Sequence, residues 1–186
     1  VYVQTTLRQL GTDDAAAAGF DREKWAAQLT PLLTLWQQLI TQCEPMRNAP
    51  AGRPDAAGGQ PVDTIIALEV NKAKALLRLV DESTGAIGRV VRGTELLDAT
   101  TKAQGSALAS GTVPSAWSDV WEGPEAPVPW MKQAVSKMVA LCQWQQASLG
   151  GNLLRSPLRL AELLSPSFFL TALRQQTARQ ARVPMD

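Results

Sequence analysis

The residue types that most often perform chemistry in proteins are absent or poorly placed in this chain of 186 residues. It contains no histidine, which excludes Ser-His and Cys-His nucleophile pairs and every zinc site built with histidine. The two cysteines, Cys43 and Cys142, are far apart in sequence and form no CxxC pair. Cys142 falls on an apolar helical stripe, where a free cysteine packs as a small hydrophobic side chain. We expect both thiols to be unreactive core residues, as is usual in a reducing compartment.

One acidic pattern has a catalytic precedent. The run from Leu76 to Glu82 is apolar and ends in Asp81 and Glu82, like the strand that holds magnesium and activates water in P-loop ATPases. The same residues continue a helical stripe that begins at Ile66, and the sequence has no GxxxxGK[ST] phosphate loop. The other acidic residues show no paired spacing. We interpret the two acids as an exposed helix end and expect no catalytic, cofactor-binding or metal site.

Charge and hydropathy exclude two further classes of protein. Eighteen Lys and Arg residues against seventeen Asp and Glu give a net charge of +1, so binding of nucleic acid by bulk charge is not expected. No apolar run approaches the roughly 18 residues that cross a bilayer, so no membrane insertion is expected. Five basic residues near the end of the chain lack interleaved aromatic residues, which favours a solvated face or an intramolecular contact: Arg155, Arg159, Arg174, Arg179 and Arg182.

The spacing of apolar residues predicts an all-α protein of packed amphipathic helices. The first expected helix carries a stripe from Trp25 to Trp36 and Leu39, with Asp21 as N-cap and a break near Thr30, because Pro31 follows. The other expected elements are a helix with its stripe from Ile66 to Val80, a short helical piece at 85–93, a weaker helix at 94–110, a helix at 129–149, irregular or briefly extended structure at 153–164, and a last helix with Ser165 as N-cap and Pro166 in its first turn.

Two segments lack helical spacing. Residues 43–61 hold four prolines and three glycines, a composition typical of a flexible loop or a domain boundary. Residues 111–129 combine four prolines with Trp117 and Trp121, and Trp130 follows directly. A loop with few regular hydrogen bonds needs large apolar anchors, so we favour pinning of these rings within the fold over binding of a partner.

Several motifs resemble the extreme C-terminal motor region of the dynein heavy chains, over nearly the whole sequence. Val91-Arg92-Gly93-Thr94 resembles a turn of the family's C-terminal domain, and Val113-Pro114 with Ser115 and Trp117 resembles its vPxxW element. Two longer matches are Phe20-Asp21-Arg22-Glu23 with Trp25, Leu29, Pro31, Leu35 and Trp36, and Pro166 with Phe169-Leu170-Thr171-Ala172-Leu173, Gln175, Ala178 and Arg179. The loop Trp121-Glu122-Gly123-Pro124-Glu125 and the stretch Glu162-Leu163-Leu164-Ser165-Pro166 are most similar to cytoplasmic dynein 2, the intraflagellar-transport branch.

This resemblance implies that the sequence is a segment of a longer protein. Residues 1–61 would be the end of the sixth AAA+ module, and residues 62–186 the first, helical part of the C-terminal domain. The segment would be non-catalytic and brace the AAA+ ring of an ATP-driven, minus-end-directed microtubule motor for retrograde intraflagellar transport. ATP and magnesium would bind upstream. The implied partners are the rest of the ring, microtubules, other dynein subunits and intraflagellar trains, in the cytoplasm and the cilium.

The resemblance also supplies a set of structural or interface candidates: Trp25, Trp36, Pro114, Trp117, Trp121, Trp130, Pro166, Phe169, Leu170, Leu173 and Arg179. An alternative remains open at the level of the sequence. The protein would then be a self-contained helical adaptor that binds a protein partner through the loop tryptophans and the basic terminal helix. Both hypotheses predict mostly helix, and they differ in the length of the natural polypeptide.

Overall fold

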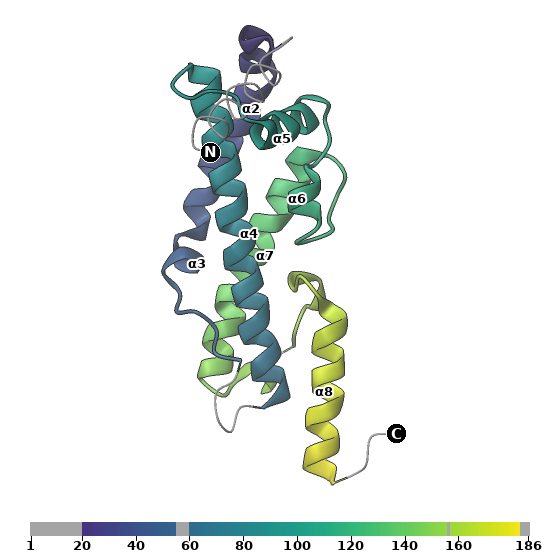
Figure 1. Cartoon of the computed structure of the whole chain (residues 1–186). Coiled ribbons are helices and arrows are strands. Elements are labelled where there is room, and N and C mark those ends of the chain that lie inside the picture. Colours follow the sequence, from purple (N-terminus) through teal and green to yellow (C-terminus); the bar gives the residue numbers. More distant parts are fainter. Residues whose placement is uncertain (1–19, 55–59, 156, 183–186) are drawn as a thin grey trace, which may run out of the picture. The chain divides into compact units, whose positions relative to one another are not determined.

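The computed structural model describes residues 20–54, 60–155 and 157–182, and it is built from helices (Figure 1). The long helices are α2 (Arg22–Ile40), α4 (Pro61–Arg92), α7 (Pro127–Leu149) and α8 (Pro166–Ala181). The short ones are α3 (Glu44–Asn48), α5 (Ala99–Ala109) and α6 (Ser115–Ser118), with 3-10 turns at Thr41–Cys43, Leu153–Arg155 and Leu160–Glu162. The described residues contain no strand, and the predicted all-α class is confirmed.

The protein divides into two compact units. The first unit comprises residues up to 39 together with 78–131, and the second comprises 40–77 together with the residues from 132 onward. Helix α4 contributes to both, because residues 61–77 belong to the second unit and residues 78–92 to the first.

In the first unit, α2 buries the predicted stripe. Asp21 caps the helix by accepting a hydrogen bond from the backbone N–H of Lys24 at 3.0 Å, as expected. The predicted break near Thr30 is wrong, because α2 continues through Pro31. A proline inside a helix costs about 3 kcal/mol or more. Burial of Leu29 and Trp36, on either side of the proline, outweighs that cost.

Helix α4 is longer than its sequence predicts. A separate helical piece at 85–93 is not found, because α4 runs without interruption through both glycines of that stretch to Arg92. Ile87 and Val90 continue the buried stripe there, so tertiary packing outweighs the weak helix propensity of glycine. Asp81 and Glu82 therefore lie in the middle of a helix rather than at its end, which corrects our expectation. Asp81 accepts a hydrogen bond from the indole N–H of Trp36 at 3.3 Å.

In the second unit, part of the expected flexible loop is ordered. Cys43 and Met46 are fully buried, and residues 44–48 form α3. Gly52 exchanges two hydrogen bonds with the side chain of Asn71, at 2.9 and 3.1 Å. A Cβ atom at Gly52 would lie 2.2 Å from the carbonyl oxygen of Ala67, so only glycine allows this approach. Residues 55–59 lie outside the described part of the protein.

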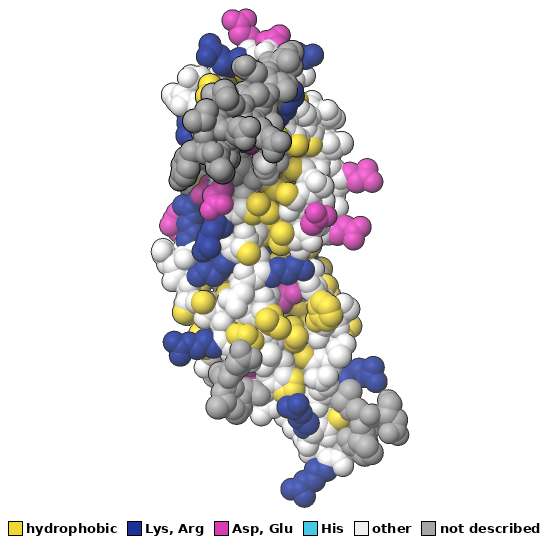
Figure 2. All heavy atoms as spheres, in the orientation of Figure 1, with side chains coloured by type: hydrophobic (Ala, Val, Ile, Leu, Met, Phe, Trp, Pro, Cys, Tyr) yellow, Lys and Arg dark blue, Asp and Glu magenta, His cyan; other side chains and the backbone are white. Residues whose placement is uncertain are grey.

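Three other boundaries differ from the prediction. Helix α5 begins at Ala99 because residues 93–98 form a turn, and α7 begins at Pro127, where a proline suits the first helical position. Residues 153–164 are irregular and contain two 3-10 turns. Acidic and basic side chains are both present on the face shown in Figure 2. Within the described ranges, no helix is long and apolar enough to cross a membrane.

The contact between α5 and α2 gives a first testable prediction. Gly105 is buried, and a Cβ atom there would lie 2.3 Å from ring atoms of Trp25. We expect Gly105→Ala to destabilise the protein by about 1–3 kcal/mol, because overpacking exceeds the gain in helix propensity. Urea unfolding measures the change.

Gly85→Ala is the matched control for that substitution. At Gly85 the nearest atom to an added Cβ is a guanidinium nitrogen of Arg89 at 3.4 Å, so the same replacement should stabilise by about 0.5–1 kcal/mol. Equal effects of the two variants would contradict the packing of Trp25 on α5.

Candidate functional site

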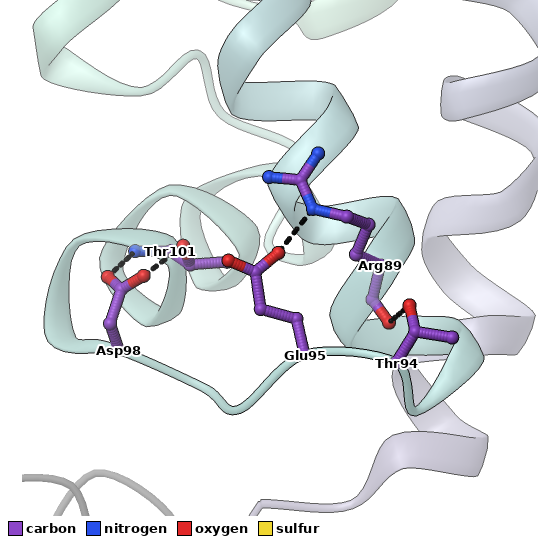
Figure 3. Close-up of polar contacts among 5 residues, drawn as sticks. All are labelled: Arg89, Thr94, Glu95, Asp98 and Thr101. Carbon is purple, nitrogen blue, oxygen red and sulfur yellow. Dashed lines mark hydrogen bonds and ion pairs between the residues drawn. The ribbon is translucent and has the colours of Figure 1, made fainter.

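The turn between α4 and α5, in the first unit, is held by a dense set of polar contacts (Figure 3). The N–H of Gly93 donates to the carbonyl of Val90 at 2.9 Å, and the N–H of Thr94 donates to the carbonyl of Arg89 at 3.0 Å. This pair of bonds is a Schellman motif, and Gly93 takes the left-handed conformation that it needs, with φ of 76°. Arg89 also forms an ion pair with Glu95. The motif that resembles a family turn is therefore a well-capped helix end.

Asp98 caps the next helix in the same turn. Its two carboxylate oxygens accept hydrogen bonds at 2.8 Å, one from the backbone N–H and one from the hydroxyl of Thr101. Partial burial acts to raise the pKa of this carboxyl, but the hydrogen bonds outweigh it and hold the pKa below its ordinary value. We did not select Asp98 from the sequence, although an acid followed by Ala-Thr-Thr is a readable N-cap signal.

Three tryptophans form the aromatic cluster of the first unit. The ring of Trp130 lies 5.5 Å from that of Trp117 and 5.4 Å from that of Trp121, measured between centroids. The indole N–H of Trp117 donates to the Ser83 hydroxyl at 3.2 Å, and that of Trp130 donates to the carbonyl of Trp121 at 3.4 Å. All three rings are buried, with Trp117 and Trp130 fully inaccessible. They pin the proline-rich loop within the fold, as we expected.

The second unit contains a polar clamp, formed by Glu69, Lys72 and Lys137 around residues 161–165. The Glu69 carboxylate is buried and accepts hydrogen bonds from the backbone N–H of Leu164 at 2.6 Å and of Ser165 at 3.3 Å. Lys72 donates to the Ser165 hydroxyl at 2.9 Å, and Lys137 donates to the carbonyls of Ala161 and Leu163. The backbone just before α8 is therefore held by charged groups of α4 and α7.

Charge compensation within the clamp is internal. Burial lowers the pKa of Lys137, and the nearby carboxylates of Glu69 and Glu162 act in the opposite direction. Ser165 occupies the N-cap position of α8 as predicted, but its hydroxyl accepts no helical N–H because Lys72 engages it. The sequence signal for the clamp was weak. Glu69 lies beside the buried stripe of α4, and its partners are 95 and 96 residues away.

Helix α8 packs through a narrow stripe. Phe169 meets Trp144 edge-on with centroids 5.3 Å apart, and Gln176 accepts a hydrogen bond from the backbone N–H of Val62 at the start of α4. Phe169, Ala172 and Gln176 are the buried residues of this helix. The rest of α8 is partly or fully exposed.

The eleven residues selected from the sequence fall into two groups. The buried members are Trp25, Trp36, Pro114, Trp117, Trp121, Trp130 and Phe169. Pro166 and Leu173 are half-buried, whereas Leu170 and Arg179 are exposed. The structure brings Trp117, Trp121 and Trp130 together, while Phe169 and its neighbours on α8 belong to the other unit. Their role as interface residues stays a prediction.

The buried thiols have little capacity for chemistry. Burial, followed by the charge of Cys142, raises the pKa of the Cys43 thiol to about 11, and burial also raises the pKa of Cys142. The Cys43 sulfur lies 3.9 Å from that of Met138. Within the described residues, no group of three or more His, Cys, Asp or Glu side chains is placed to bind a metal ion.

A family model for the C-terminal domain of the dynein heavy chain matches residues 3–186. Curated relatives named cytoplasmic dynein 2 heavy chain 1 include those of Tripneustes gratilla, 39% identical over 100% of this sequence, Chlamydomonas reinhardtii, 38% over 99%, and Homo sapiens, 37% over 99%. The 186 residues span 4% of the length of each of these relatives. The expected division at residue 61, between a sixth AAA+ module and a C-terminal domain, stays a prediction.

The Asp98 cap predicts a pH dependence. Asp98→Ala should cost about 1 kcal/mol at pH 7, typical for the loss of an N-cap. Because the folded pKa is lowered, the ionised cap contributes in full above the unfolded value of about 3.9, and its contribution is lost as the pH falls through the lower folded value. The difference between wild type and Asp98→Ala should therefore shrink in acid, as measured by urea unfolding from pH 7 to pH 2.5.

Asp98→Asn is the control for this pH series. Asparagine caps helices nearly as well as aspartate and does not titrate, so its stability relative to Asp98→Ala should change little with pH. A wild type that keeps the same advantage over Asp98→Ala at pH 2.5 would contradict the charged cap.

The polar clamp predicts local loosening when its carboxylate is neutralised. Glu69→Gln removes the charge that two backbone N–H groups share, and hydrogen bonds to charged groups contribute about 1.5–3 kcal/mol. Amide hydrogen exchange at residues 163–170 should accelerate. Glu82→Gln, an exposed position on the same helix, is the control and should leave that exchange unchanged. Unchanged exchange in Glu69→Gln would show that the clamp does not hold the start of α8.

Proposed function

Since this protein segment belongs to the family of dynein heavy chain domains that lie at the C-terminus, we propose that it is a non-catalytic structural part that braces the AAA+ ring of a dynein motor. The match to the family model over residues 3–186 carries this proposal. The parent would be an ATP-driven, minus-end-directed microtubule motor that moves retrograde intraflagellar trains. Its ATP and magnesium would bind in upstream AAA+ modules.

The identities favour the dynein 2 branch. They lie between 37% and 39% for the dynein 2 heavy chains of Tripneustes gratilla, Chlamydomonas reinhardtii and Homo sapiens. The dynein heavy chain of Caenorhabditis elegans that is named cytoplasmic without the number 2 is 28% identical over 85% of this sequence. The implied partners are the rest of the ring, other dynein subunits, microtubules and intraflagellar trains, and the implied location is the cytoplasm and the cilium.

The packing of the described residues supports a bracing role. The buried indoles of Trp36 and Trp117 each have a hydrogen-bond acceptor, Asp81 for the first and Ser83 for the second. The turn between α4 and α5 is capped at both helix ends. Closely packed interiors of this kind resist deformation and transmit strain. A rigid body without reactive groups suits a mechanical part better than a catalytic one.

Two experiments on the parent protein test the proposal. An antibody against this segment should detect, on a denaturing blot of extract from the source organism, a band many times larger than the segment itself. Deletion of residues 62–186 from the purified heavy chain should lower the ATPase rate, the gliding velocity and the thermal stability of the motor.

A point variant separates bracing from a gross deletion. Trp130→Ala removes a fully buried ring, and such losses cost about 3–5 kcal/mol. It should lower the ATPase rate and velocity of the intact motor, whereas the control Leu96→Ala, at a side chain that is 81% exposed, should not. A band of the segment's own size would favour the adaptor hypothesis. A motor unaffected by the deletion would rule out bracing.

A further inference from the structure

One face of the second unit leaves large apolar side chains uncovered in the described structure. Phe168 is 63% exposed, Leu170 46% and Leu68 47%. Hydrophobic side chains gather over α4 and α8 in the lower half of Figure 2. Exposed apolar side chains close to one another mark surfaces that bind another part of a protein assembly.

A groove lies between the start of α4 and α8. Its volume is about 270 Å³, and its lining residues are Pro61, Thr64, Ile65, Phe168, Thr171, Ala172, Gln175 and Arg179. The lining residues include no acid, and Arg179 is the charged one. An occupant with an apolar side chain and a carboxylate would match both the apolar walls and the arginine.

The charge around the groove is positive and unbalanced. The sequence from Pro166 to Arg182 has no acidic residue, while Arg174, Arg179 and Arg182 are exposed. The structure records no ion pair for these arginines within the described ranges. The acids on the nearby part of α4 are already engaged, because Glu69 accepts from backbone N–H groups and Asp63 accepts from the Ser148 hydroxyl. The missing negative charge must therefore come from outside this unit's described residues.

We infer that this groove docks a segment of the parent heavy chain from outside residues 1–186, with an apolar side chain against Phe168 and Ile65 and a carboxylate on Arg179. The inference rests on the proposed function, because it needs a long parent polypeptide. The 186 residues span 4% of the length of the dynein 2 relatives, so a parent of that length offers many such segments. An intramolecular segment is also present at high effective concentration, which suits a groove of this modest size.

The experiment uses the intact heavy chain and a matched pair of photocrosslinkers. Thr171 and Thr177 are both exposed residues of α8, and the hydroxyl of each donates to the carbonyl four residues earlier, at 3.1 and 2.9 Å. Only Thr171 lines the groove. Benzoylphenylalanine is placed at one position or the other in the purified motor, and crosslinked peptides are identified by mass spectrometry.

We expect the probe at Thr171 to crosslink to a peptide of the same heavy chain that contains Asp or Glu beside an apolar residue. The probe at Thr177 should give much less of that product. Arg179→Glu should weaken the Thr171 crosslink, and reversing the identified acid to Lys in the same polypeptide should restore it. Arg179→Gln should give an intermediate yield.

Several results would overturn the inference: crosslinks from Thr171 to a separate polypeptide, a crosslinked peptide without acidic residues, equal yields from both positions, or no effect of Arg179→Glu. The ATPase rate of the same preparations separates this failure from failure of the proposed function. A motor that depends on residues 62–186 but gives no Thr171 crosslink contradicts the docking segment alone. A motor that crosslinks as expected but tolerates the deletion contradicts bracing alone.

Discussion

The constraint on which both units depend is the burial of one long amphipathic helix, α4. Its 32 residues carry an apolar stripe that no isolated helix can hide from water, so other helices must cover it. Ile66 and Val70 supply that stripe to the second unit, and Val80 and Ile87 supply it to the first. Because burial alone is non-directional, the apolar stripe fixes that helices pack on α4 but not where each one lies.

Polar side chains of α4 provide the missing direction. Asp81 and Ser83 accept the indole N–H groups of Trp36 and Trp117. In the second unit, Asn71 holds Gly52, and Glu69 with Lys72 holds the residues before α8. Each of these bonds is modest in free energy, but a buried polar group left without a partner is costly. Alternative placements of these segments would break such pairs, so the polar contacts select one packing.

Local sequence patterns predicted what is local and missed what is set between distant residues. The period of the stripes predicted α2, α4, α7 and α8, and Ser165-Pro166 predicted where the last one starts. The breaks expected at Pro31 and at the glycines near 85 are wrong, because propensity costs of about 1–3 kcal/mol are smaller than the burial on either side. The order of residues 43–54 and the clamp at Glu69 depend on partners many residues away, which no local pattern encodes.

The same reasoning separates the two kinds of residue that the family motifs contain. Trp117, Trp121 and Trp130 are buried with their N–H groups or rings engaged, so a partner reaches them only if the unit unfolds. Leu170 and Arg179 lie in the last family motif but face outward from a helix that is attached by a narrow stripe. One set of motif residues therefore builds a rigid body. The other is available to connect that body to the rest of the motor, and a brace needs both properties.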